Sequence, residues 1–422
     1  MELFSGLLLD VTPETGHDAV GRLPEKESRR QCSIRLVHAC ELPIRVEGEQ
    51  GFDMDSHQLA GVSHAAFQLR VPGSGTPVRV DASSGHLNSD RHRLDVSVIA
   101  IDLGGTKVAS AIVSDKGEIF TRAHTLLGGS GAREVAELVI EHCHTLLGQG
   151  EGDDEAPHAV GIVVPGIYRA EQGTVWAPNI PGWEEYPLRD ELREALGPEL
   201  RVVIDSDRAA YILGETWQGA ARGARDAIFL AVGTGIGAGI LVDGRVVRGH
   251  ADIAGAIGWL ALDRPYLSRY TDCGCFEYHA SGPGLTMVAR ALLEADPDYD
   301  GELRHVESSE LSPALVFGAY DRGDEIARRV LDDAIQFWGM ATANLVSLFN
   351  PETIVFGGGV FGPALRFLDR ISTEARQWAQ PIAMQGVRLV ASTLGADAGL
   401  YGAARLALTT EHADPSALRP SR

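Results

Sequence analysis

From Val96 onward, apolar and polar positions follow two regular patterns along the chain. Short, wholly apolar runs predict buried strands, and apolar positions three or four residues apart predict helices. The predicted strands are residues 96–101, 109–113, 119–121, 160–164, 201–204, 227–232 and 353–356. The predicted helices are residues 132–147, 208–215, 324–349 and 397–408. Because short strands recur between long helices, the pattern predicts an α/β protein.

Residues 1–95 follow neither pattern and mix His, Arg, Ser and Gly without a clear period. Residues 71–77 (Val-Pro-Gly-Ser-Gly-Thr-Pro) are typical of a loop. The segment contains no convincing helix-turn-helix pattern. We expect a poorly ordered or atypical N-terminal extension here, with a genuine accessory domain as the alternative, and a tail at residues 411–422.

Composition narrows the classes of partner. The 422 residues suffice for two domains, and acidic residues outnumber basic ones by 58 to 37, a net charge of −21. That charge disfavours nucleic acid and anionic membranes. No apolar run approaches the roughly 20 residues that cross a bilayer, and the N-terminus lacks the pattern of a signal peptide. Five cysteines fit a reducing compartment, so we expect a cytoplasmic protein without nucleic-acid or membrane partners.

Two glycine- and threonine-containing loops follow predicted strands, one in each half of the chain. Glycine allows several backbone amides to approach one anion, and threonine adds a hydroxyl donor. The sequence therefore predicts a triphosphate held between two lobes and a phosphoryl transfer. The candidate residues of the first loop are Asp102, Gly104, Gly105, Thr106 and Lys107, and those of the second are Gly233, Thr234, Gly235 and Gly237.

Five motifs in order resemble those of the ROK family (repressor, open reading frame, kinase). They are residues 102–107, 165–166 with 177–183, 233–239, 350–359 and 394–404. The resemblance implies an α/β, two-lobed, actin-like ATPase fold (hexokinase-like, ribonuclease H-like) with the nucleotide in the cleft between the lobes. The implied lobes are residues 96–204, joined by a C-terminal helix at 395–410, and residues 205–394. A sugar kinase using ATP and Mg²⁺, and a homodimer, are implied as well.

The same resemblance assigns roles to single residues. The family's catalytic Asn-Asp pair corresponds to Ser206 and Asp207, which makes Asp207 the expected general base and places Ser206 at the substrate. A helix N-cap is the alternative for Asp207, and both roles are compatible. Asn179 belongs to the sugar-side loop. Asp102 is expected to contact Mg²⁺ indirectly, and the expected nucleoside end comprises Gly357, Gly358 and Gly359.

The chain departs from the family where sugar and zinc are bound. The family's Glu-x-Gly-His segment corresponds to residues 256–259, Ala-Ile-Gly-Trp, so both polar sugar contacts are absent. Of the zinc cysteines only a Cys273-Gly274-Cys275 remnant remains, with His279 and His250 as further candidates. We expect no structural zinc and no metal ligands in the protein; Trp259, at the substrate site, is expected to fill that space by packing. Glu277 matches the family's remaining sugar-binding Glu, with an exposed helix-start acid as the alternative.

These residues predict an ATP-dependent carbohydrate kinase whose acceptor is not bound as in typical glucokinases. A pocket lacking partners for a hydroxyl disfavours glucose and favours a deoxy sugar, an N-acyl amino sugar, a cyclitol or another less hydroxylated polyol. The alternative is a non-catalytic carbohydrate-sensing regulator that kept the fold. The phosphoryl donor stays open between ATP, ADP and polyphosphate. His142 and His144 are expected at the surface or edge of their helix, not as ligands.

Overall fold

The computed structural model describes residues 66–69, 78–81, 96–148 and 157–409. The chain divides into two compact units, Met1–His92 and Arg93–Arg422. In the first unit, strands β1 (Ala66–Leu69) and β2 (Val78–Asp81) pair antiparallel. The extension predicted at residues 1–95 and the tail predicted at 411–422 lie largely or wholly outside the described residues. All that follows concerns the second unit.

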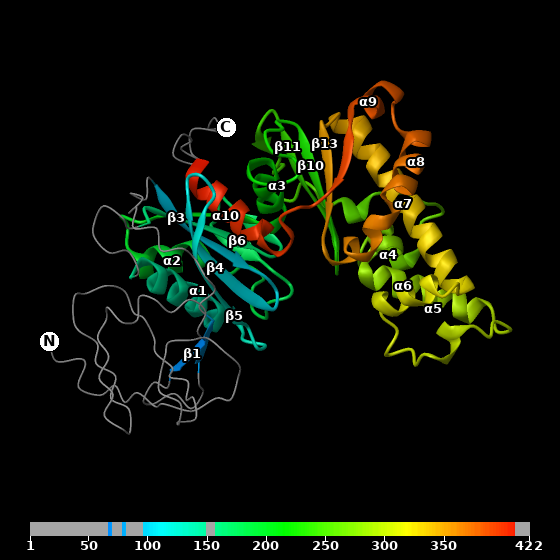
Figure 1. The fold of residues 1–422 in the computed structure, drawn as a ribbon, viewed down its shortest axis with the longest axis horizontal. Coiled ribbons are helices and arrows are strands. Elements are labelled where there is room, and N and C mark those ends of the chain that lie inside the picture. Colours follow the sequence, from blue (N-terminus) through cyan, green and yellow to red (C-terminus); the bar gives the residue numbers. More distant parts are fainter. Residues whose placement is uncertain (1–65, 70–77, 82–95, 149–156, 410–422) are drawn as a thin grey trace, which may run out of the picture. The chain divides into compact units, whose positions relative to one another are not determined.

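The first lobe of this unit is built on a five-stranded sheet with the order β5-β4-β3-β6-β9 (Figure 1). Its first three strands form an antiparallel meander, and β6 and β9 run parallel to β3. A small antiparallel hairpin, β7–β8, follows β6. The strands are β3 (Ser97–Leu103), β4 (Lys107–Ser114), β5 (Ile119–Leu126), β6 (Ala159–Val164), β7 (Ile167–Arg169), β8 (Thr174–Trp176) and β9 (Arg201–Ser206).

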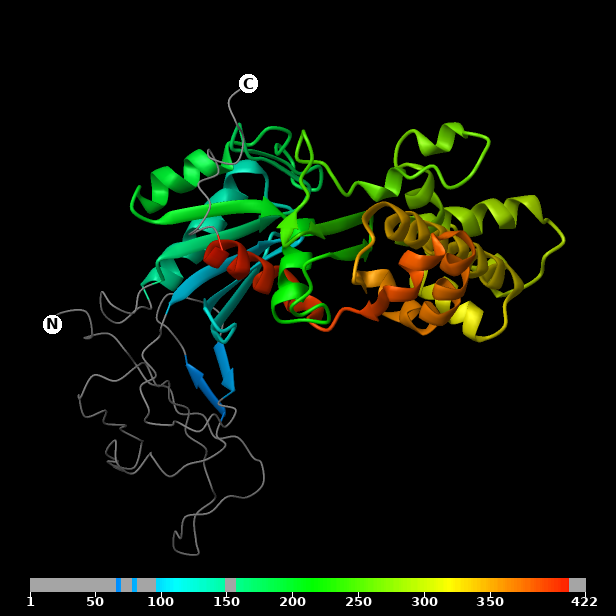
Figure 2. The same ribbon diagram turned by 90° about the horizontal axis from the view of Figure 1, so that it is seen from above.

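The period of two in β3 divides its side chains between two buried clusters. Ile99 and Ile101 pack with the helices α1 (Ala132–Leu147) and α2 (Leu188–Leu196). Val98 and Ala100 pack instead with α10 (Ala398–Thr409), the C-terminal helix. That second cluster consists mostly of alanines, so α10 lies close to the sheet, as Figure 2 shows. The C-terminal helix therefore completes the first lobe.

The second lobe repeats the same sheet order, β12-β11-β10-β13-β14. Again the first three strands form an antiparallel meander, and the last two run parallel to the central strand. The strands are β10 (Ala227–Val232), β11 (Ile236–Val242), β12 (Arg245–Val246), β13 (Thr353–Gly357) and β14 (Arg388–Ala391).

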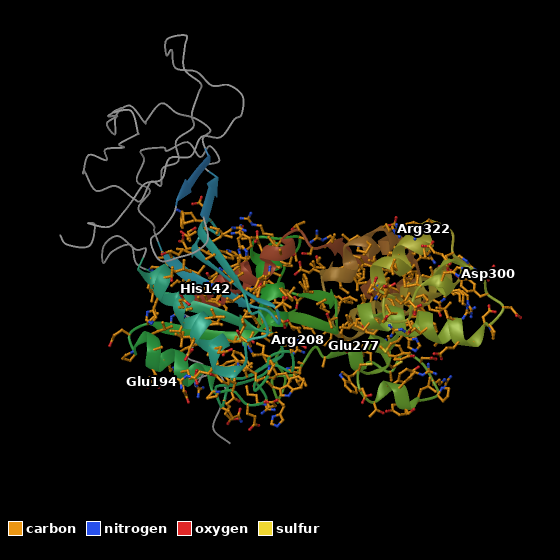
Figure 3. All side chains as sticks on the ribbon, turned by 90° about the horizontal axis from the view of Figure 1, so that it is seen from below. His142, Glu194, Arg208, Glu277, Asp300 and Arg322 are labelled. Atoms are coloured by element: carbon orange, nitrogen blue, oxygen red, sulfur yellow. The ribbon has the colours of Figure 1, made fainter. Side chains whose placement is uncertain are left out.

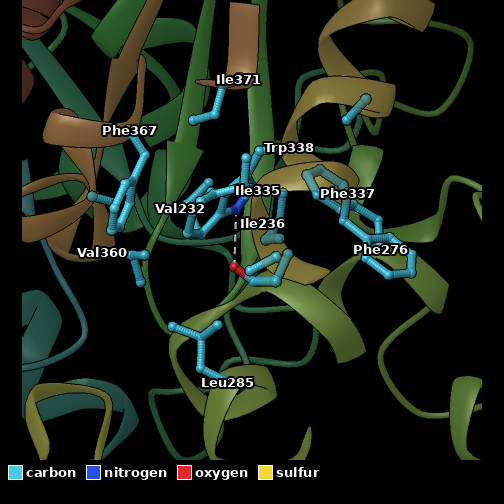
Figure 4. Close-up of a cluster of buried hydrophobic side chains, with 14 of the residues drawn as sticks. Val232, Ile236, Phe276, Leu285, Ile335, Phe337, Trp338, Val360, Phe367 and Ile371 are labelled. Atoms are coloured by element: carbon cyan, nitrogen blue, oxygen red, sulfur yellow. Dashed lines mark hydrogen bonds between the residues drawn. The ribbon is translucent and has the colours of Figure 1, made fainter. Parts of the chain in front are cut away.

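A helical layer covers one face of the second sheet, and its core is shown in Figure 4. There the buried Trp338 donates its indole N–H to the carbonyl oxygen of Ala280, 3.1 Å away. The helices are α4 (Cys275–Ala280), α5 (Gly282–Ala295), α6 (Pro313–Asp321), α7 (Glu325–Phe349), α8 (Leu368–Trp378) and α9 (Pro381–Gly386). Short 3-10 turns are η2 (Ile257–Trp259), η3 (Ser268–Tyr270), η4 (Glu302–His305), η5 (Gly359–Phe361), η6 (Pro363–Phe367) and η7 (Gly395–Asp397).

The longest helix, α7, begins and ends where its sequence predicts. Asp324 is the N-cap, and its carboxylate accepts the amide hydrogen of Ala327 at 2.9 Å. Asn350 ends the helix in the left-handed conformation, with φ of 45°, and Pro351 cannot continue it. No helix in the described part of the chain is long and apolar enough to cross a membrane.

Helix α3 (Asp207–Trp217) contacts elements of both lobes: α10 and β9 of the first, and β10 and β11 of the second. Its approach to α10 is close, because a Cβ at Gly402 would overlap the backbone of Ala210. The predicted lobe boundary between residues 204 and 205 falls within β9, which runs to Ser206. The lobe boundaries themselves stay a prediction.

His142 corrects one expectation. It is buried, with Nδ1 2.7 Å from the hydroxyl of Ser110 and Nε2 2.9 Å from that of Thr125, and desolvation lowers its pKa. The prediction of a surface position was wrong for His142 and right for His144, which is exposed. Two hydroxyl partners on neighbouring strands allow the neutral ring to be buried.

Candidate active site

The first glycine loop is the turn between β3 and β4. The Gly104 amide donates to the carbonyl oxygen of Lys107 at 2.8 Å, which closes a tight turn. Within the described residues, the amides of Gly105 and Thr106 have no acceptor. A Cβ at Gly105 would lie 3.2 Å from the Cβ of Asn179. The first loop therefore meets the predicted sugar-side loop and carries unpaired donors.

The second glycine loop is the equivalent turn between β10 and β11. The Gly233 amide donates to the carbonyl oxygen of Gly235 at 3.0 Å, and the Gly233 carbonyl accepts the Gly282 amide at 2.8 Å, at the start of α5. As far as the structure describes the chain, the amides of Thr234 and Gly235 donate to no acceptor. Gly237 follows in β11. Unpaired donors therefore occur in both lobes.

Gly357, Gly358 and Gly359 lie beside this second loop. Gly357 ends β13, and Gly358 and Gly359 follow it. Because β13 is the parallel neighbour of β10, the carboxyl ends of the two strands lie at one edge of the sheet. Gly358 has φ of +89°, and a Cβ there would overlap Val232, so only glycine fits. A Cβ at Gly233 would lie 3.9 Å from the amide nitrogen of Gly359. The structure thus brings together the two segments that were predicted to contact the nucleotide in the second lobe.

Glu277, in α4, holds the second loop from behind. Its Oε2 atom accepts the Ile236 amide at 2.6 Å. Burial raises the pKa of this carboxyl, and the Ile236 amide partly opposes the shift. The alternative of an exposed acid is therefore wrong. Contact between Glu277 and a sugar stays a prediction, because the bond seen here is to the backbone of the phosphate loop.

Carboxylates gather at the carboxyl edge of the first sheet. In the parallel register, Asp102 of β3 pairs with Val163 of β6, and Val163 pairs with Asp205 of β9. Ser206 is buried and occupies the N-cap position of α3, so Asp207 is the first residue of the helix. The Asp207 Oδ1 atom accepts the amide of the next residue at 2.7 Å. The N-cap alternative for Asp207 is therefore wrong.

The two carboxyls predicted for the site at this edge, those of Asp102 and Asp207, both have raised pKa values. Burial raises the pKa of Asp207 to about 6, against the opposing effects of the Arg208 charge and amide. Burial and then the charge of Asp207 raise the pKa of Asp102 to about 6, against the effect of Lys107. The carboxyl of Asp102 also lies directly against Gly399 of α10. A carboxylate with a pKa near 6 can accept a proton at neutral pH.

Sequence reasoning missed an ion pair beside these residues. Asp205 is buried, and its Oδ2 accepts the Nε–H of Arg248 at 3.0 Å, with a second bond from the same guanidinium. The other oxygen, Oδ1, accepts the Ser206 amide at 2.8 Å. The pair joins β9 to the irregular segment after β12. No signal in the sequence could have found it, because residues 247–256 have no hydrophobic period.

The residues present do not fit a zinc site. His279 donates to or accepts from the Tyr270 hydroxyl at 2.9 Å, and its ring stacks on Phe337 with a centroid distance of 4.2 Å. Cys275 is buried in the apolar core. Among the described residues, no three potential metal ligands come together. Trp259 is 58% exposed, so the prediction that it fills this region by packing was wrong.

Comparison with known proteins gives a consistent result. The sequence model of the ROK family matches residues 98–410. The chain is 32% identical over 318 residues to a glucokinase of Thermotoga maritima, covering 74% of this chain and 97% of that protein. It is also 29% identical over 284 residues to a xylose repressor of Caldicellulosiruptor bescii, covering 67% of this chain and 70% of that protein.

Among solved structures, a ROK family glucokinase from Streptomyces griseus in complex with glucose and AMPPNP superposes with a TM-score of 0.58. Sequence identity is 30%, and the match covers 74% of this chain and 99% of that one. The predicted two-lobed, actin-like ATPase fold is confirmed. The two matched lobes, their glycine loops and the similarity over three-quarters of the sequence show that this chain belongs to the ROK family.

Proposed function

We propose that the protein is an ATP-dependent carbohydrate kinase with Asp207 as its general base. One observation carries the proposal. Asp207, whose pKa is raised to about 6, lies near enough to Asp102 for its charge to raise the pKa of that carboxyl, and Asp102 is in β3, the strand that leads into a loop of unpaired amides. A second such loop lies in the other lobe. A base that is ionised at neutral pH and two sets of anion-binding donors are what phosphoryl transfer to a hydroxyl requires.

In this mechanism the chain's residues orient the reactants and accept one proton. The amides of the two glycine loops, with Lys107, would hold the phosphates, and Gly357–Gly359 would border the nucleoside. Asp207 accepts the proton of the acceptor hydroxyl as its oxygen attacks phosphorus. Mg·ATP supplies the phosphoryl group, as the AMPPNP complex of the Streptomyces griseus glucokinase supports, and Asp102 would contact the metal indirectly.

We propose that the acceptor is not bound as typical glucokinases bind glucose. Ala256 offers no hydrogen-bond partner and Trp259 only an indole N–H donor, so a hydroxyl placed there would lack the acceptor that the Glu of those kinases supplies. Asn179, Ser206 and Glu277 remain proposed substrate contacts. A homodimer and a cytoplasmic location also stay predictions.

ADP release with Mg·ATP, measured across hexoses, amino sugars, deoxy sugars, sugar acids and cyclitols, tests the kinase. Acceptor-dependent turnover should be lost in Asp207→Asn and kept in Asp300→Asn. Asp300 is a suitable control because its side chain is 92% exposed and lies at the far end of the second lobe in Figure 3. Equal turnover in wild type and Asp207→Asn would rule out Asp207 as the base.

A non-catalytic carbohydrate sensor is the second candidate, favoured by the similarity to a xylose repressor. It predicts a rise in melting temperature with a sugar but no turnover on any acceptor. Retention of Asp207 and of both loops favours the kinase. A clear glucose preference over 2-substituted sugars would contradict the altered acceptor pocket but leave the kinase intact.

A further inference from the structure

Arg208 extends its side chain from the start of α3 across to both lobes, next to the proposed base. A Cβ at Gly237 would lie 2.8 Å from the Cδ of Arg208, so the aliphatic stem packs on β11. The guanidinium donates to the carbonyl oxygens of Gly166 at 3.4 Å and Ala254 at 3.5 Å. Figure 3 shows Arg208 near the junction of the lobes, not far from Glu277.

The charge of Arg208 has no partner charge in ion-pair contact within the described residues. Its neighbour Arg248 differs, since that guanidinium is paired with the buried Asp205. The two hydrogen bonds of Arg208 are long and go to neutral carbonyls. A guanidinium has five N–H donors in a planar fork that matches a carboxylate or phosphate. Arg208 is therefore a half-buried cation with donors to spare.

The contacts of Arg208 place it on the acceptor side of the site. Gly166 belongs to the predicted sugar-side loop, and Ala254 lies two residues before Ala256. Ala256 stands where typical relatives carry a sugar-binding glutamate. The site has thus lost a hydrogen-bond acceptor and holds a cationic donor nearby. A hydroxyl gains little from this exchange, whereas a group that only accepts hydrogen bonds gains much.

We infer that the acceptor is an anionic carbohydrate, such as a sugar acid, whose charged group pairs with Arg208. The inference rests on the proposed function for the reaction, but the binding step can be tested alone. An anionic group would meet a guanidinium that has no ion-pair partner among the described residues, and would replace two long bonds to neutral carbonyls by bonds in which both donor and acceptor are charged. A carboxylate and a phosphate share this chemistry, so both sources are included in the test.

An arginine beside a catalytic base could instead stabilise the transferred phosphoryl group. The contacts of Arg208 speak against that role. Only its aliphatic stem packs on Gly237 of the second glycine loop, whereas the partners of its guanidinium, Gly166 and Ala254, lie outside both loops. The two roles also differ in outcome, since a phosphoryl contact would affect every acceptor equally and an acceptor contact only the anionic ones.

The test is the affinity of the full chain for D-glucuronate and for its neutral amide, D-glucuronamide, measured by calorimetry without nucleotide. The two differ in charge but hardly in shape. Wild type should bind glucuronate at least about tenfold more tightly than the amide, as expected for one charge-assisted hydrogen-bonded contact. Arg208→Ala should abolish this ratio, and Arg208→Lys should keep part of it because the charge remains without the fork. Arg133→Ala, at an 82% exposed side chain of α1, should leave it unchanged.

Glucose 6-phosphate against glucose forms the second arm. An Arg208-dependent preference in this arm alone would keep the anionic site and identify phosphate as its source. Equal affinities within both pairs, or a preference that survives in Arg208→Ala, would overturn the inference. Arg208-dependent binding without turnover on any acceptor would instead contradict the kinase, and turnover of neutral sugars alone would contradict the inference and leave the kinase standing.

Discussion

The two lobes share one sheet topology and differ in the residues that lie at the carboxyl edge of the sheet. Each has a three-stranded meander, two further parallel strands, and a glycine loop in the first hairpin. In the first lobe Asp102 and Asp205 lie near the ends of β3 and β9, on either side of β6, and Asp207 follows β9 at the start of α3. In the second, β10 runs into Gly233 and β13 ends at Gly357, with no carboxylate at either strand end, and Glu277 supports the loop from behind. Both lobes thus present unpaired backbone donors in their glycine loops, and the first adds two carboxyls with pKa values of about 6.

The lobes also differ in how their sheets are covered. The second lobe places helices α4–α7, which lie within residues 275–349, between its meander and β13, and these bury a large core against one sheet face. The first lobe uses the small residues of α10, and so brings a helix start against Asp102. Because the carboxyls with pKa values of about 6 lie in the first lobe, we expect the two lobes to differ in their sensitivity to mutation, and the following changes measure that difference.

The largest loss of activity is expected when Asp207, the proposed base of the first lobe, is replaced. Asp207→Asn should lower kcat by about 10²–10⁴-fold, because the proton of the acceptor hydroxyl loses its recipient. Thr234→Ala, in the loop of the second lobe, should raise KM for ATP with a much smaller change in kcat. Steady-state kinetics with both substrates varied separates the two. Similar losses of kcat in the two variants would show that the lobes do not divide the chemistry.

A smaller loss should follow from displacing Asp102 without changing it. In Gly399→Ala, the new Cβ would overlap the Asp102 carboxylate and force it to move. We expect kcat/KM to fall by roughly 10–100-fold, since misplacing a positioning group by about 1 Å has effects of that order. Gly386→Ala is the control, because a Cβ at the end of α9 meets nothing within 4 Å. Unchanged kinetics in Gly399→Ala would mean that the position of Asp102 is unimportant.

The sequence predicted the elements that depend on regular periods and failed where a contact from a distant segment decides. The positions of the loops, the buried strands and α7 follow from glycine placement, apolar runs and a capping residue. His142 was misplaced because its two hydroxyl partners lie on strands that its own helix pattern does not reveal. The Asp205–Arg248 pair and the reach of Arg208 depend equally on a long-range approach of irregular backbone.

Trp259 and Glu277 show that a residue's position in a family motif does not predict the contacts of its side chain. A tryptophan in place of a histidine suggested packing, yet the side chain of Trp259 is exposed, while Tyr270, Phe276 and Tyr278 are buried in the core of this lobe. Glu277 was found from its motif position, but its bond to the loop backbone was not. Residue identity predicts which chemistry is available, while the partner is set by the fold around it.

The pH dependence should reveal the carboxyls of the first lobe. Asp207 has a pKa of about 6 and must be ionised to act as a base. The rate constant kcat/KM should therefore be level above pH 7 and fall about tenfold per pH unit well below 6. Measurement between pH 5 and 8 with a saturating donor checks this. A midpoint near 4 would indicate an exposed, ordinary carboxylate as the base.

In the second lobe, we expect substitution of Glu277 to raise KM for ATP several-fold and to leave KM for the acceptor unchanged. Glu277→Ala removes the acceptor of the Ile236 amide and should loosen the loop, whereas Glu277→Gln keeps an oxygen there and should be milder. If KM for the acceptor rises instead, and both variants are equally affected, Glu277 contacts the sugar directly. This pair of variants decides between the two roles that remain open for Glu277.

The smallest effect concerns stability, and it opposes the effect on activity. Because the pKa of Asp207 is raised in the folded chain, ionisation of this carboxyl destabilises the fold as pH rises from about 4 through 6. Denaturant titration should therefore give Asp207→Asn a free energy of unfolding higher than that of wild type at pH 8, by on the order of 1–3 kcal/mol. At pH 4 the two free energies should be equal. Glu277→Gln should gain less at pH 8, since the Ile236 amide already offsets part of the desolvation of that carboxylate. If Asp207→Asn gains equal stability at both pH values, or if Glu277→Gln gains more than Asp207→Asn at pH 8, the pH-dependent destabilisation does not come from Asp207.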